Sequence, residues 1–222
     1  MQRTALTALV GLLVVSAGCT GLLTGDTVEF TANEASVGDS ALESTGYEGQ
    51  NATEQTIERD VEVGGQARTV RIPTHYAVYA RTGNVSGIEA GGNISGDEVP
   101  ETAQFADFST PGAQMAGQSL NPAARLSNQE LIERLSGQVG SIEDVEFEEN
   151  RTTESLDAER EVSVFTGTTT LDGQEIDVRI HVASFEHEGD VIIATGVHPV
   201  QIEEDENIDE LLGGIEHSGD DG

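Results

Sequence analysis

The sequence contains no lysine and no tryptophan, and its only cysteine is Cys19. Ten arginines stand against 41 Asp and Glu residues, which gives a formal net charge of −31. Proteins that bind a nucleic-acid backbone cluster Lys and Arg on one surface, whereas these arginines are scattered from Arg3 to Arg179. The composition therefore predicts no nucleic-acid partner, and a single thiol excludes an internal disulfide.

Large apolar residues are also scarce. Leu, Ile, Val and Phe make up 54 of 222 residues, a share of about 24%, slightly above the roughly 20% below which a highly charged chain is expected to stay disordered. This content supports one small domain with an aliphatic, β-branched core.

Motifs of common enzymes are missing as well. The sequence has no GxSxG elbow, no GxGxxG turn and no P-loop. Its five histidines, at positions 75, 181, 187, 198 and 217, form no HxH, HxxxH or HExxH pattern. We predict no catalytic residue and no cofactor from the sequence.

The N-terminus is the most informative segment. Residues 1–18 carry one positive charge, Arg3, and about a dozen apolar residues between Ala5 and Ala17. A membrane-spanning helix needs about 20 apolar residues, while a secretory signal needs roughly 7 to 15 followed by small residues. We therefore predict a lipoprotein signal peptide over 1–18, lipid on Cys19, a short tether over 19–26, and attachment to the extracytoplasmic face of the membrane. An uncleaved anchor and a secreted protein with a buried Cys19 are the alternatives, and the export route stays open.

The acidic excess predicts the solvent. Without residues 1–18 the chain loses Arg3 and no acid, and its self-repulsion is screened when the Debye length falls to roughly 3 Å at about 1 M salt. We expect a halophilic protein whose carboxylates form a solvated surface, although a calcium-loaded surface or a disordered acidic tail stays open locally. Four Asn residues lie in glycosylation sequons: Asn51, Asn84, Asn93 and Asn150.

Apolar periodicity predicts an α+β fold, mostly antiparallel sheet with hairpins, a three-stranded meander and two or three helices packed on it. Pro73 removes a ladder donor, so its strand is expected at a sheet edge or broken there. The single domain spans 27–217, includes a long surface loop over 82–103 and precedes a frayed acidic tail over 218–222. The expected elements are a strand over 27–32, a helix near 37–45, a hairpin around Gly64–Gly65, a strand over 105–111, a helix from the Ser127 capping box, strands 145–171, 174–187 and 191–197, and a helix containing Ile208 and Ile215.

Two groups are weak candidates for metal ligands, and we predict no metal site at either. His181 and His198 lie on strands expected to pair, with unknown register. Asp205, Asn207 and Asp209 occupy positions 1, 3 and 5 of a calcium-loop pattern, but position 6 is not the Gly that its sharp turn requires. The apolar spacing of the same segment favours a helix.

Several local patterns together resemble a known group of proteins. The sequence is similar to haloarchaeal lipoproteins of an uncharacterised family, domain of unknown function 6517, over nearly the whole chain after the leader. More loosely, the order of elements from 127 to 216 resembles the Mog1/PsbP-like sandwich. The patterns that carry the family resemblance are the leader into Cys19, Phe108–Pro111, Asn121–Pro122 before Ser127, Leu171–Gly173 and Ala194–Val197. This resemblance brings no known activity or site.

The sequence thus predicts a lipid-anchored, salt-adapted binding or scaffolding module at the archaeal cell surface, with its partner or ligand unidentified. The alternative is a hydrolase-like enzyme whose residues converge only in three dimensions. A pocket that holds two of His75, His181 and His198 with a carboxylate would favour the enzyme.

The charge excess generates a test of salt dependence. We expect cooperative folding in multimolar salt and loss of the β-sheet circular dichroism on dialysis to low salt, because repulsion between carboxylates is then unscreened. Acidification to about pH 4 to 5, where carboxylates begin to protonate, restores part of the signal. Identical spectra and melting temperatures in low and high salt would contradict adaptation to brine.

Overall fold

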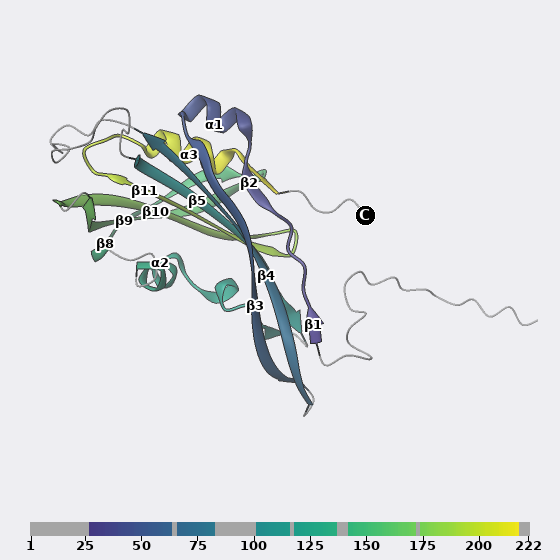
Figure 1. Ribbon diagram of the computed structural model, residues 1–222. Coiled ribbons are helices and arrows are strands. Elements are labelled where there is room, and N and C mark those ends of the chain that lie inside the picture. The colour runs from purple at the N-terminus through teal and green to yellow at the C-terminus, as the bar shows by residue number, and fades with distance from the viewer. Residues whose placement is uncertain are drawn as a thin grey trace, which may run out of the picture.

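A twisted, mostly antiparallel sheet dominates the computed structural model, which describes residues 27–63, 66–82, 101–115, 118–136, 142–171 and 174–217. Its eight strands follow the order β1-β4-β5-β11-β10-β9-β8, with β3 also paired to β4, and only β1 runs parallel to its neighbour (Figure 1). The strands are β1 (Thr27–Glu29), β3 (Glu48–Val63), β4 (Gln66–Thr82), β5 (Glu101–Pro111), β8 (Glu143–Ser155), β9 (Ala158–Leu171), β10 (Gln174–His187) and β11 (Asp190–Pro199).

Three helices and two small sheets complete the described fold. The helices are α1 (Asp39–Thr45), α2 (Asn128–Ser136) and α3 (Asp205–Gly213), with a 3-10 turn at Ala123–Arg125. The small sheets pair β2 (Ala35–Val37) with β12 (Ile215–His217), and β6 (Gln114–Met115) with β7 (Gln118–Ser119). The prediction of an α+β fold with a mostly antiparallel sheet is therefore confirmed. None of the helices in the described residues is long and apolar enough to cross a membrane.

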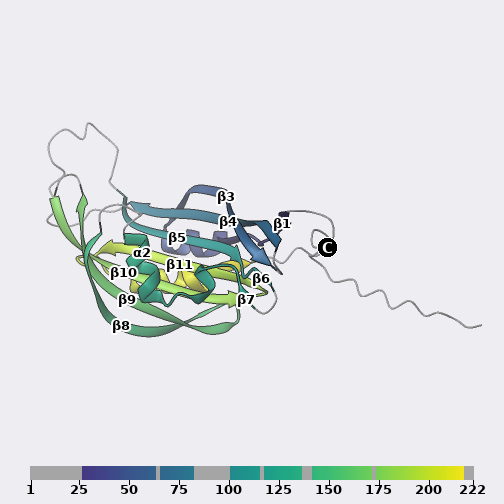
Figure 2. The ribbon, with the colours of Figure 1, turned by 90° about the horizontal axis from the view of Figure 1, so that it is seen from below.

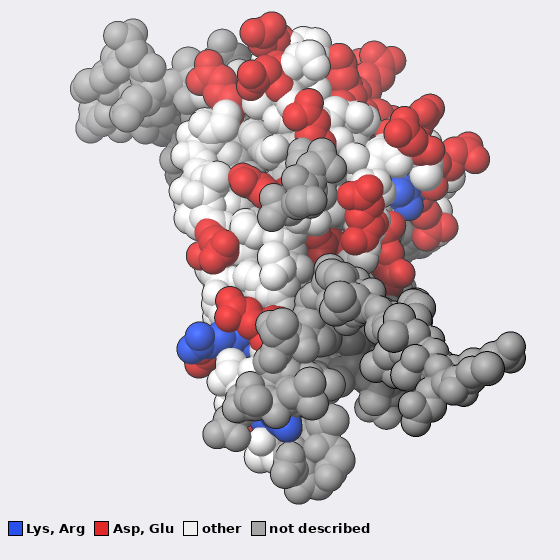
Figure 3. All heavy atoms as spheres, turned by 90° about the vertical axis from the view of Figure 1, so that its right-hand side faces the viewer, with Lys and Arg blue, Asp and Glu red and all other residues white. Residues whose placement is uncertain are grey.

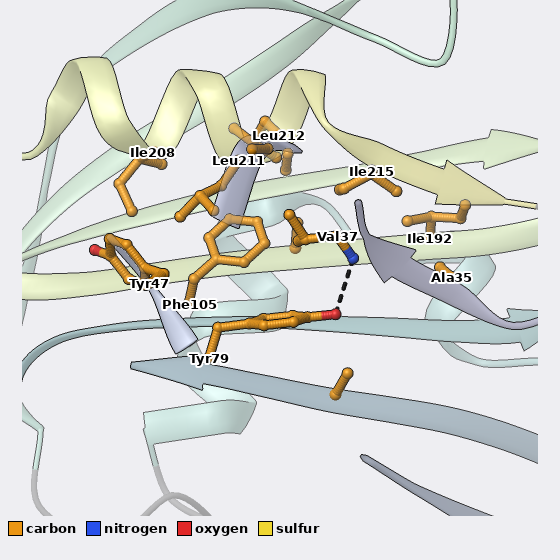
Figure 4. Packing of buried hydrophobic residues seen from close by; sticks show 14 of the residues in the cluster. Ala35, Val37, Tyr47, Tyr79, Phe105, Ile192, Ile208, Leu211, Leu212 and Ile215 are labelled. Atoms are coloured by element: carbon orange, nitrogen blue, oxygen red, sulfur yellow. Dashed lines mark hydrogen bonds between the residues drawn. The ribbon is translucent and has the colours of Figure 1, made fainter. Parts of the chain in front are cut away.

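Side chains that alternate along β10 supply both faces of the sheet. Val178, Ile180 and Val182 share a hydrophobic cluster with Leu131 and Ile132 of α2. The intervening side chains face the opposite way, on the side where Figure 2 and Figure 1 place α1 and α3. The second cluster, which includes residues of β5, β11, α1 and α3, fills that side (Figure 4).

The α2 helix begins as its sequence predicts. The backbone N–H of Ser127 donates to Glu130 Oε2 at 2.9 Å, and the Glu130 N–H donates back to Ser127 Oγ at 3.3 Å. This reciprocal pair is the predicted capping box.

Close packing of α3 depends on a glycine in the strand below it. Ile208 and Leu211 of α3 are fully buried in the second cluster. A Cβ atom added at Gly196 of β11 would lie 2.6 Å from Ile208 Cδ1, too close for any real contact. The missing side chain at position 196 therefore lets the helix approach the sheet.

Three predictions from the sequence differ in part from the structure. The closing helix stops at Gly213, and Ile215 belongs to β12 because the chain extends there to pair with Val37 of β2. The strand with Pro73 is not at the edge of the sheet, because β3 pairs along one side of it and β1 and β5 share the other. The predicted break is present only on the second side, where β1 pairs as far as Arg71 and β5 pairs from His75. Both ends of the predicted loop 82–103 belong to strands, since Thr82 is the last residue of β4 and residues 101–103 begin β5. Residues 83–100 lie outside the described residues.

A carboxylate is buried in the middle of the sheet. Asp107 of β5 lies between Ala77 and Ala194 on the neighbouring strands and has no solvent exposure. Burial raises the pKa of Asp107 to about 7, and the Tyr79 hydroxyl offsets part of the rise. That hydroxyl accepts the backbone N–H of Val37 at 2.8 Å, which ties β2 to the sheet (Figure 4).

The position of Asp107 generates a prediction on stability. Its unfolded-state pKa is near 3.8, so the folded state binds more protons than the unfolded state between roughly pH 4 and 7, and stability falls as pH rises through that window. Asp107→Asn removes the buried charge, and we expect a higher melting temperature than wild type at neutral pH and above, with the gain vanishing near pH 4.

Thermal melts in multimolar salt across this pH range measure the difference. Asp177→Asn is the matched control, because Asp177 lies on β10 in an exposed position. Equal pH profiles for wild type and Asp107→Asn would contradict the assignment.

Candidate functional site

The structure brings the two sequence-predicted histidines together. His181 of β10 lies opposite Gly196, and His198 of β11 lies opposite Arg179, so the two imidazoles are diagonal neighbours on one face of the sheet. Their Nε2 atoms are 3.0 Å apart, and the rings stack with centroids 5.2 Å apart. Asp205 Oδ1, from the start of α3, lies 3.4 Å from His181 Nε2 and 3.9 Å from His198 Nε2.

Hydrogen bonds at the outer nitrogens fix the protonation of this pair. Arg151 Nη2 donates to His181 Nδ1 at 3.1 Å, so the proton of neutral His181 lies on Nε2. His198 Nδ1 donates to the Pro199 carbonyl at 3.0 Å, which leaves His198 Nε2 as an acceptor. His181 therefore donates to His198, and every ring nitrogen of the pair is satisfied.

Electrostatics keep these histidines neutral. Burial, together with the nearby His198, Arg151 and Arg179, lowers the pKa of His181 to about 3. Burial also lowers the pKa of His198. At neutral pH the pair therefore carries no charge and acts as a buried polar network.

The other residues of the calcium-loop pattern find different partners. Asp209 pairs with Arg151, and Asn207 Nδ2 donates to Glu204 Oε2 at 2.9 Å. Asp205 begins α3 and accepts from Arg179 Nη1 at 3.1 Å. Of these three weak candidates, only Asp205 approaches the histidines, because the segment forms the helix that its apolar spacing favours.

A buried ion pair fixes the start of α3. Glu204, which precedes the helix and is fully buried, pairs with Arg81 of β4. Its Oε2 atom also accepts the Tyr47 hydroxyl at 3.2 Å. These contacts hold the first turn of α3, and therefore Asp205, next to the sheet.

A second histidine cluster escaped the sequence analysis. His187 Nδ1, at the end of β10, lies 2.9 Å from His217 Nδ1, at the end of β12. His217 Nε2 is 3.2 Å from Asp190 Oδ2, and Glu188 lies in the turn between β10 and β11 with its carboxylate within 4.8 Å of both imidazoles. We call these four residues the His187–His217 cluster. His187, Glu188 and Asp190 are neighbours in the sequence, but β12 was not predicted, so nothing in the sequence brought His217 to them.

An apolar pocket lies on the opposite, α2 side of the sheet. Its lining includes side chains of β4, β5, β10, β11 and α2. The rings of Tyr76 and Phe108 contact each other at one wall, with centroids 4.5 Å apart and planes tilted by 33°. Gln104 and Thr195 supply polar groups, while neither His181 nor His198 lines the pocket.

The remaining predicted sites lie apart from these clusters. Asn51 and Asn150 are exposed on β3 and β8, the two outer strands of the sheet. His75 of β4 contacts the Ala32 carbonyl at 3.2 Å and does not join the other histidines. Cys19, Asn84 and Asn93 lie outside the described residues.

Comparison with solved structures gives no functional assignment. The protein of unknown function PA94 from Pseudomonas aeruginosa matches with a TM-score of 0.24 and 9% identity, over 68% of this chain and 72% of that chain. At this score the likeness supports no shared fold. The Mog1/PsbP-like architecture stays a prediction from the sequence. No curated protein matches the chain.

Comparison with family models gives a clear result. The model described as "Domain of unknown function (DUF6517)" matches residues 34–216, which include the three described helices, the strands from β2 to β11 and the first two residues of β12. The chain therefore belongs to the DUF6517 family.

Proposed function

We propose that this protein is a lipid-anchored extracytoplasmic module that binds a small, mostly apolar ligand in the pocket beside α2. In this proposal Cys19 carries the lipid, and the acidic surface keeps the domain soluble in brine. Figure 3 supports the second point, since one face of the molecule displays many acidic side chains and few basic ones.

The pocket is the observation that carries the proposal. Val78, Ala106 and Val197 give it apolar walls, and Gln104 and Thr195 add groups that can orient a ligand by hydrogen bonds. Ligand sites of proteins are typically concave and apolar with a few placed polar groups. The pocket lies between the sheet and α2. Most of its lining comes from β4, β5, β10 and β11, and the pairing of these strands holds the lining side chains in place.

A hydrolase-like enzyme is the alternative function. His181, His198 and a carboxylate do meet, but the enzyme hypothesis also requires a pocket around them, and neither histidine lines the pocket beside α2. The imidazoles are only 1% and 2% exposed, and Arg151 occupies the outer nitrogen of His181. A general base must reach its substrate, so the pocket supports binding better than the histidines support catalysis.

The ligand proposal predicts binding of a neutral apolar dye. We expect N-phenyl-1-naphthylamine to gain fluorescence with the full chain in multimolar KCl, and Ala106→Phe to weaken this binding at least tenfold by filling the pocket. Ala67→Phe is the matched control, because Ala67 lies on β4 in an exposed position away from the pocket. Circular dichroism checks that both variants fold. Equal dye binding by wild type and Ala106→Phe would reject the pocket as the site.

The anchor generates a separate prediction. Cys19→Ser removes the only thiol that can carry a thioether-linked lipid, so we expect an unprocessed precursor or release of the protein into the medium. Intact mass and membrane fractionation measure both outcomes. A mutant with unchanged mass and unchanged membrane retention would refute lipidation.

A further inference from the structure

We propose that the His187–His217 cluster is a binding site for a divalent transition-metal ion of the Zn²⁺ class, independent of the ligand pocket. His187, Glu188 and His217 supply two imidazole nitrogens and one carboxylate, and their ligand atoms all lie within 4.8 Å of one another. This donor set, nitrogen with oxygen, suits Zn²⁺, Co²⁺ or Ni²⁺, whereas Mg²⁺ and Ca²⁺ prefer oxygen alone.

Asp190 prepares His217 for this role. Its carboxylate can only accept, so the 3.2 Å contact assigns a proton to His217 Nε2 and leaves a lone pair on Nδ1. That lone pair is directed toward His187 Nδ1, 2.9 Å away. Metal-binding histidines usually donate their other N–H to a carboxylate in this way. Asp190 is itself held by the backbone N–H of Asn33, at 2.8 Å from the same Oδ2 atom.

In the His181–His198 pair, the outer ring nitrogen faces a cation and not a carboxylate. Arg151 donates to His181 Nδ1, so a metal on His181 Nε2 would force a proton onto Nδ1 and bring two donors together. A metal is therefore expected at the second cluster and not at the first, although both contain two imidazoles and a carboxylate.

Access also favours the second cluster. His217 and Asp190 are buried, but His187 is half-buried and Glu188 is exposed. An ion can therefore enter from solvent and meet a rigid ligand backed by the sheet. Three protein ligands leave a fourth position of a tetrahedral ion open to water or a substrate.

High salt restricts what can bind here. At about 1 M salt the Debye length is roughly 3 Å, so the large negative charge of the chain attracts distant cations only weakly. Affinity must come from coordination bonds at short range, which imidazole nitrogens form with transition metals. This argument selects Zn²⁺-class ions over the alkali and alkaline-earth ions that dominate brine.

Cobalt provides a direct test. The full chain in multimolar KCl with excess Mg²⁺, which occupies surface carboxylates, is titrated with Co²⁺ while its visible d–d absorption is recorded; Zn²⁺ is then added as a competitor. We expect one equivalent of Co²⁺ bound with nitrogen ligation and displaced by Zn²⁺. His187→Ala should weaken binding at least tenfold, and Asp190→Asn should weaken it roughly 10- to 100-fold through the orientation of His217.

Matched variants make the result decisive. Asp205→Asn alters the first histidine pair and should leave Co²⁺ binding unchanged, while Glu188→Gln changes an exposed side chain and should weaken binding in a folded protein. Circular dichroism verifies each variant. The proposal is overturned if wild type binds no Co²⁺ under these conditions, if Glu188→Gln and folded His187→Ala both bind like wild type, or if Asp205→Asn abolishes binding.

Discussion

The placement of α3 depends on one buried ion pair. Glu204 is completely enclosed, and removing its partner Arg81 would leave a buried carboxylate at a cost of several kcal/mol, on the order of 3 to 5. Because α3 starts at the next residue, this pair determines where Ile208 meets the sheet. It also determines where the chain leaves the helix to form β12, which carries His217. Both histidine clusters therefore depend on a contact that neither of them contains.

The two faces of the sheet have different chemistry. The α2 side is apolar around its pocket, while the α1 and α3 side buries two carboxylates, Asp107 and Glu204, and three imidazoles, those of His181, His198 and His217. A buried polar group must be paired or it destabilises the fold. The two imidazole pairs are satisfied differently, through Arg151 in one and Asp190 in the other. The charge of the side chain at the outer ring nitrogen, positive for Arg151 and negative for Asp190, decides whether the inner nitrogen keeps a lone pair for a metal ion.

Local patterns in the sequence predicted local structure well. The Ser127 capping box and the alternation along β10 each specify an element through contacts within a few residues, and the structure has both. The approach of His181 and His198 followed from strand pairing, but their contact required the register that places His181 opposite Gly196. Register depends on packing across the whole sheet, so the sequence left it open.

Non-local and unusual features were missed. His187 and His217 are 30 residues apart and meet only because β12 pairs with β2. The turn between β8 and β9 uses Leu156 and Asp157 at φ +48° and +58°, where Gly or Asn is the expected signal. Tertiary packing overrides local preference at both places. The segment 205–213 is the converse case, because its apolar spacing favoured a helix over a calcium loop and the structure has α3 there.

The two outer strands of the sheet, β3 and β8, affect how two molecules of this protein can associate. β3 and β8 end the sheet with long exposed edges, 16 and 13 residues, that invite pairing with a second molecule. Salt of about 1 M screens repulsion between carboxylates beyond roughly 3 Å. Strands that join edge to edge lie about 4.8 Å apart, which is more than this Debye length. The acidic residues along both edges therefore oppose edge-to-edge pairing strongly at low salt and only weakly in brine.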